Sequence, residues 1–73
     1  DQASFQFAIG KNENVDFYII DCIGKVIDYR RIQASMGVNK FSIDFSNYSS
    51  GLYSYSFKTS DRIITKKLLV TDL

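Results

Sequence analysis

Two segments near the end of the sequence, Ser50-Gly51-Leu52-Tyr53-Ser54-Tyr55 and Ile63-Ile64-Thr65-Lys66-Lys67-Leu68-Leu69-Val70, show the clearest pattern in the chain. In the first, aromatic residues at every second position from Tyr53 to Phe57 alternate with serines, which is typical of a β-strand with one buried face. The second combines aliphatic residues with two adjacent lysines, and Thr59-Ser60-Asp61 lies between the two segments. Because such short polar residues favour tight turns, we expect the two segments to form a β-hairpin.

The same alternation extends toward the N-terminus through four further segments, residues 5–9, 15–20, 25–34 and 41–45. These segments are rich in aromatic and β-branched residues and are separated by turn-forming residues, a combination that predicts successive strands. The longest of them, 25–34, is expected to be the most exposed. The spacing predicts an all-β, immunoglobulin-like antiparallel sandwich of six to seven short strands. The expected core consists of Phe17, Ile19, Phe41, Ile43, Tyr53, Tyr55 and Phe57.

Composition restricts the class of protein. The 73 residues are enough for a single domain, 1–73, and a start without methionine suggests a fragment of a longer secreted protein. With Cys22 as the single cysteine and no histidine, the chain cannot form an internal disulfide, a typical zinc site or a histidine-assisted nucleophile. A net charge of +1 argues against a nucleic-acid partner, and no apolar run approaches the ~20 residues of a membrane-spanning helix. We therefore expect no enzyme, no cofactor, no metal and no direct membrane insertion.

Two groups of side chains are the remaining candidates for a site. The first are carboxylates on or near the predicted strands, namely Asp21, Asp28 and Asp44. A turn cap and solvated strand faces explain them better than acid–base catalysis does. The second are tyrosines, namely Tyr18, Tyr53 and Tyr55. These are interpreted as core residues with hydroxyls at the edge, with a sugar-binding platform as the alternative. Within Asp21-Cys22-Ile23-Gly24, Asp suits the first position of a type I turn and Gly suits the fourth, where φ can be positive.

Several short motifs follow one another along the chain. Asp21-x-x-Gly24-Lys25-x-Ile27 comes directly after the aliphatic segment 15–20, and Gly37-x-Asn39 marks a later turn. Ser50-Gly51-x-Tyr53-x-Tyr55 and Lys66-Lys67-Leu68-Leu69-Val70 complete the series. Over roughly residues 5 to 70, these motifs together resemble the type A C-terminal sorting domain of cargo proteins of the bacterial type IX, or Por, secretion system. Members of that family usually begin with an Asn-Pro pair near a first strand, and this chain has no proline.

The resemblance implies that the domain is a sorting signal and not a catalyst. A passenger domain upstream in the same chain would enter the periplasm by its own signal peptide, and the type IX translocon would then recognise the sorting domain. A sortase-like peptidase would usually remove the domain and leave the passenger on the cell surface or in the medium. The residues implied in translocon recognition are Gly51, Tyr53, Lys66, Lys67, Leu68 and Val70. Those implied in the motif turns are Asp21, Gly24, Lys25 and Gly37. The alternative is a non-catalytic immunoglobulin-like accessory module that binds carbohydrate or spaces another domain.

Overall fold

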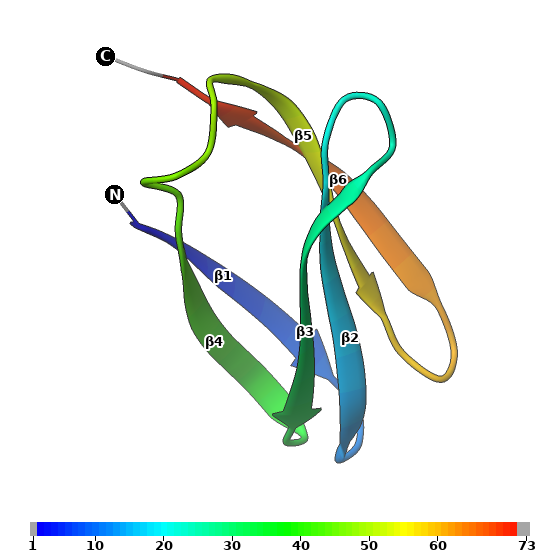
Figure 1. Cartoon of the computed structure of the whole chain (residues 1–73). Helices are drawn as coiled ribbons and strands as arrows, with labels where there is room; N and C mark the ends of the chain where they lie inside the picture. The colour runs from blue at the N-terminus through cyan, green and yellow to red at the C-terminus, as the bar shows by residue number, and fades with distance from the viewer. Residues whose placement is uncertain (1, 72–73) are drawn as a thin grey trace.

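Six strands form two antiparallel sheets that pack face to face (Figure 1). The computed structural model describes residues 2–71. In chain order the strands are β1 (Gln2–Ile9), β2 (Glu13–Ile20), β3 (Val26–Ala34), β4 (Gly37–Asp44), β5 (Gly51–Lys58) and β6 (Ile63–Val70). β1 and β4 make a two-stranded sheet, and the other strands make a four-stranded sheet in the order β3-β2-β5-β6. The prediction of an all-β antiparallel sandwich is confirmed, with six strands in the described part of the chain.

Three strands begin earlier than the alternating pattern predicted. β1, β2 and β4 start at residues 2, 13 and 37 rather than at 5, 15 and 41. Strand pairing uses backbone groups, so a polar residue continues a ladder as well as an apolar one. Asn14, for example, pairs with Gln33, and Lys40 pairs with Gln6. Alternation of apolar side chains marks only the buried stretch of a strand.

The core fills the space between the two sheets. Its buried apolar side chains are Phe5, Val15, Phe17, Ile19, Ala34, Ile43, Tyr53 and Phe57. Five of the seven predicted core residues are among them, and the other two, Phe41 and Tyr55, are half-buried against the same cluster. β3, the longest strand, is mostly exposed, as expected. Within residues 2–71, no helix is long or apolar enough to cross a membrane.

The two-stranded sheet covers only the middle of the four-stranded sheet. The ring of Phe5 lies 4.9 Å from that of Tyr55, and β1 therefore lies over β5. On the other strand of the pair, the ring of Phe41 lies 4.8 Å from that of Phe17, and β4 therefore lies over β2. The outer strands β3 and β6 consequently extend beyond the sheet that packs on them, one on each side.

Candidate functional site

The C-terminal motifs form the predicted hairpin of β5 and β6. The two strands pair along their whole length, from Gly51 opposite Val70 to Lys58 opposite Ile63. The turn is closed by Thr59, whose N–H donates to the carbonyl oxygen of Arg62 at 2.9 Å. β6 is an edge strand of the sheet in the described residues. The backbone N–H and C=O groups of every second residue therefore point away from β5 and have no strand partner.

The two lysines of β6 face opposite sides of this sheet. Lys66 lies opposite Tyr55 and therefore on the inner side, whereas Lys67 lies opposite Ser54 on the outer side. Both side chains are exposed, and neither has an ion-pair partner within residues 2–71. Adjacent strand residues always point to opposite faces, which is why the sequence required at least one of the two to be exposed. The edge strand therefore presents positive charge on both faces.

The apolar residues of the same motif attach β6 to the core. Leu68 lies opposite Tyr53, and Val70 lies opposite Gly51. Leu68 and Val70 are half-buried against the core cluster, while Leu69, on the outer face, is 67% exposed. The sequence Lys-Lys-Leu-Leu-Val thus supplies two exposed charges and two residues that attach the strand to the core.

Tyr53 and Gly51 are placed where they build the start of β5. Tyr53 is only 8% exposed, and its hydroxyl donates a 2.6 Å hydrogen bond to the carbonyl oxygen of Ser49 in the crossover from β4. Gly51 has a φ of +155°, a backbone conformation that other residues seldom adopt. The two residues fix the path of the chain from one sheet to the other, and they offer little surface to a partner.

The crossover contains a contact that no sequence motif predicted. The ring of Tyr48 packs 5.5 Å from that of Tyr53, and its hydroxyl donates to a carboxylate oxygen of Asp28 on β3 at 3.2 Å. Burial, and then the Asp28 carboxylate, raise the pKa of Tyr48 to about 12, so the phenol stays protonated. The one signal available was an aromatic residue within an otherwise polar loop.

The Asp21 motif is a turn held by its own side chain. The Asp21 carboxylate accepts hydrogen bonds from the backbone N–H groups of Ile23 at 3.1 Å and Lys25 at 2.9 Å. Gly24 donates to the Asp21 carbonyl at 3.1 Å and has a φ of +91°. The predicted turn with a positive φ at the glycine is confirmed, and Lys25 is exposed beside it.

The structure brings only some of the implied residues together. The Asp21 turn follows β2, whose end lies at the same end of the sheet as the start of β5 and the end of β6. Gly37 begins β4 in the other sheet, opposite Ile9, at the far end of the sandwich (Figure 1). Gly37 therefore shapes a separate turn, at the opposite end of the sandwich from the Asp21 turn.

The tyrosines considered for a sugar platform do not share a face. Tyr18 points to the outer face of the sheet, where its ring lies 5.1 Å from that of Tyr29. Tyr53 and Tyr55 are on the inner face, because Tyr55 lies opposite the buried Ile19. The platform interpretation is therefore wrong. Nor do the three carboxylates form a group. Asp21 binds the backbone of its own turn, Asp28 on β3 accepts from Tyr48, and Asp44 at the end of β4 accepts from Ser46.

The chain is a small antiparallel sandwich with motif residues in its turns and a charged, open edge strand. Its family follows from comparison with known proteins. The model of the family described as secretion system C-terminal sorting domain matches residues 3–71, and the chain belongs to this family. No curated protein and no solved structure matches the chain.

Family membership establishes the function of the domain in outline. It is a sorting signal and not a catalyst, and it directs secretion through the type IX system across the outer membrane, to the cell surface or the medium. It does so by interacting with the secretion machinery. The match is to the family as a whole, so the finer assignment to type A stays a prediction.

Proposed function

We propose that the secretion machinery recognises this domain through the free edge of β6 together with Lys66 and Lys67. The observation that carries the proposal is an edge strand with unpaired lysines exposed on both of its faces. An open edge offers backbone hydrogen bonds to an added strand, and the two ammonium groups select a partner with carboxylates on both sides of that strand. Leu68 and Val70 hold β6 in place by packing on the core.

The remaining motif residues support this surface. Gly51 and Tyr53 direct β5 into position beside β6, and Asp21 and Gly24 close the neighbouring turn. We infer that the partner is a component of the outer-membrane translocon, which meets the domain in the periplasm, and that the passenger lies upstream in the same chain. A sortase-like peptidase then removes the domain after transport.

The test is export of a reporter fusion in a bacterium with a type IX system. The domain is fused behind a fluorescent protein that carries a periplasmic signal peptide, and the Lys66→Ala, Lys67→Ala double variant is compared with a Lys40→Ala, Lys58→Ala double variant. All four lysines are exposed on strands, so the two variants lose the same charge. We expect the control to be exported like the unchanged domain and the β6 variant to accumulate in the periplasm.

Circular dichroism of the purified variants shows whether each is folded. Equal export of the two double variants would show that the lysines are not recognised. A version that ends at Thr65 lacks most of the recognition motif and part of β6. If this shortened domain were exported as efficiently as the intact one, the terminal strand would not be the sorting signal.

A further inference from the structure

β1 is an edge strand without the usual protection. Within residues 2–71, four strands of the sandwich have a paired neighbour on one side only, namely β1, β3, β4 and β6. Natural sheets protect such edges with charged residues, proline or bulges. Charged residues are present on three of the four strands, namely Asp28, Arg30 and Arg31 on β3, Lys40 and Asp44 on β4, and Lys66 and Lys67 on β6. β1, Gln2–Ile9, contains neither a charge nor a proline, which indicates an edge that is covered in use.

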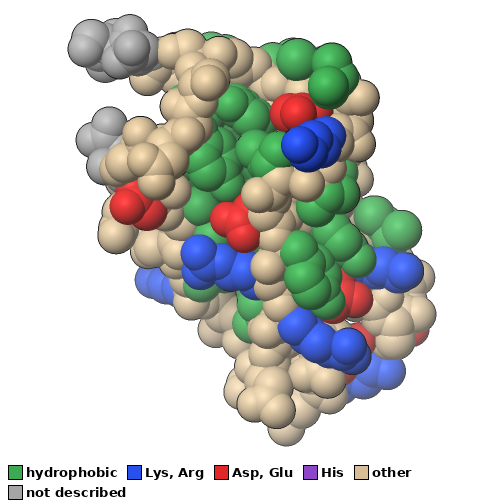
Figure 2. All heavy atoms as spheres, in the orientation of Figure 1, with side chains coloured by type: hydrophobic (Ala, Val, Ile, Leu, Met, Phe, Trp, Pro, Cys, Tyr) green, Lys and Arg blue, Asp and Glu red, His purple; other side chains and the backbone are tan. Residues whose placement is uncertain are grey.

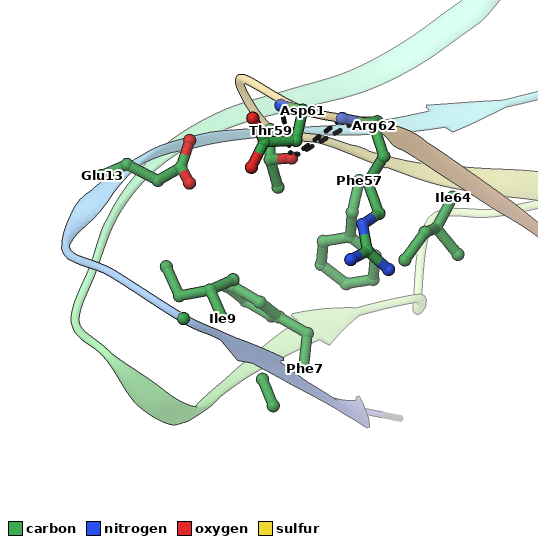
Figure 3. A pocket seen from close by; sticks show the side chains of 10 residues that line it. Phe7, Ile9, Glu13, Phe57, Thr59, Asp61, Arg62 and Ile64 are labelled. Carbon is green, nitrogen blue, oxygen red and sulfur yellow. Dashed lines mark hydrogen bonds between the residues drawn. The ribbon is translucent and has the colours of Figure 1, made fainter.

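A groove runs along this edge, above the inner face of β6. It consists of three separate hollows of about 130, 200 and 350 Å³, whose lining residues follow one another along β1 and β6. At one end Phe7 and Ile9 face Phe57 and Ile64 across the first hollow (Figure 3). The middle hollow lies between residues 6–8 and Lys66. At the other end, the third hollow lies between Ala3, the crossover residues 45–50 and the last residues of β6. Figure 2 shows apolar side chains exposed among polar ones on the face of the molecule in view. We call this feature the β1 groove.

The inner face of β6 forms the floor of the β1 groove and carries one charged side chain among apolar ones. Glu13, Asp61 and Arg62 also line the first hollow, at one end of the groove. Ile64 and Leu68 lie on the inner face of β6, and Ile64 keeps 40% of its surface exposed because the two-stranded sheet does not reach it. Lys66 lies between them on the same face, without an ion-pair partner in residues 2–71. An occupant that fits this floor has apolar side chains at alternate positions and a carboxylate at the level of Lys66.

The geometry excludes a second copy of the domain that pairs through its own β1. β1 lies over β5, and β6 extends beyond it. A second β1 placed beside the first would lie over β6 and would bring its own β5 and β6 beneath it. Those strands would occupy the same space as β5 and β6 of the first copy. The groove accepts a single extended segment that has no sheet attached beneath it.

We propose that the β1 groove binds an extended peptide segment of a partner protein by β-strand addition to β1. The segment spans about eight residues, to match the eight of β1, with apolar side chains toward β6 and a central carboxylate that pairs with Lys66. Backbone hydrogen bonds provide affinity in this mode of recognition, and alternate side-chain pockets provide specificity. The site shares Lys66 with the surface of the proposed function, but its strand pairing uses the edge of β1 and not that of β6.

The test uses a defined peptide and the isolated chain. The probe is a soluble eight-residue peptide that alternates threonine and valine, with glutamate in place of one central valine. It is titrated into the ¹⁵N-labelled domain while backbone amide shifts and hydrogen exchange are followed. We expect the amides of β1 to shift and to exchange more slowly, while those of β3 do not.

Charge-reversal variants of the two β6 lysines test whether the bound peptide contacts Lys66. Lys66→Glu should weaken binding of the glutamate peptide by about two- to fivefold, the range of an exposed ion pair, and a peptide with lysine in place of glutamate should bind this variant better. Lys67→Glu, the neighbouring lysine on the outer face, makes the same charge change and should leave binding unaltered.

Three results would overturn the proposal. The first is no change at β1 with millimolar peptide, and the second is equal weakening by the two charge reversals. The third is protection of the β1 amides without any peptide when the domain is studied with the protein sequence that precedes it, because the chain itself would then cover the edge. The readout is binding in solution, so failure here and failure of the export test are separate results.

Discussion

Replacing Tyr53 by phenylalanine separates a structural role of this residue from a role in recognition. The hydroxyl of Tyr53 donates to the carbonyl oxygen of Ser49 at 2.6 Å, and the residue is 8% exposed. Tyr53→Phe removes this hydrogen bond and keeps the ring, so the packing against Tyr48 at 5.5 Å is retained. The variant therefore tests the hydroxyl alone.

The expected loss of stability is small and can be bounded. A neutral hydrogen bond contributes about 0.5–1.5 kcal/mol to stability. Ser49 is exposed, so water can replace the lost donor at its carbonyl, and we expect about 0.5–1 kcal/mol. For a domain of this size 1 kcal/mol lowers the melting temperature by roughly 4–8 °C, so the expected decrease is about 2–8 °C. Tyr53→Ala also removes the buried ring, at about 3–5 kcal/mol, which equals the roughly 3–5 kcal/mol that so small a core supplies.

The assays are thermal unfolding followed by circular dichroism and export of the reporter fusion. We expect Tyr53→Phe to melt a few degrees lower and to be exported normally, and Tyr53→Ala to lose its fold and its export together. Tyr55→Phe is the matched control, because Tyr55 is half-buried and its hydroxyl has no hydrogen bond within residues 2–71. A Tyr53→Phe variant that melts like the unchanged domain but is not exported would refute the reasoning, since the machinery would then recognise the hydroxyl itself.

The hairpin of β5 and β6 and the Asp21 turn were predictable because their signals are local. When apolar residues alternate along a strand, the pattern shows which side chains share a face. An aspartate three residues before a glycine favours a turn. Strand partners were not predictable in this way. β1 pairs with β4, with Ile9 opposite Gly37 and Gln2 opposite Asp44, although two strands lie between them in the chain. Alternation shows which face is buried, and it carries no information about the neighbour.

The same distinction applies to the site. Adjacent lysines on a strand must face opposite ways, so the exposure of at least one of Lys66 and Lys67 followed from the sequence. The hydrogen bond from Tyr48 to Asp28 joins residues 20 positions apart, and it depends on the path of the crossover. The β1 groove exists because one sheet is offset over the other, which is a property of packing between layers. No pattern within a single strand predicts that offset. The absence of charged residues in β1 is the one feature of the sequence that indicates an edge covered by a partner.

Two further predictions concern the crossover and its glycine. An added Cβ meets no atom within 4 Å at either Gly51 or Gly10, but of these two glycines only Gly51 has a positive φ. We therefore expect Gly51→Val to lower the free energy of unfolding by about 1–3 kcal/mol more than Gly10→Val does. Equal melting temperatures of the two variants would contradict this. The second prediction concerns alkaline pH. Burial, with the Asp28 carboxylate second, raises the pKa of Tyr48 from its ordinary value of 10.0 to about 12 in the folded domain. The unfolded chain then loses the proton first, so the stability linked to this phenol is complete below pH 10 and is lost as the pH rises toward 12. Tyr48→Phe cannot ionise, and urea titrations should show the free energy of unfolding of the unchanged domain falling relative to this variant over that interval alone. A difference between the two proteins that stays constant through the interval would show that the folded domain does not hold the phenol in its protonated form.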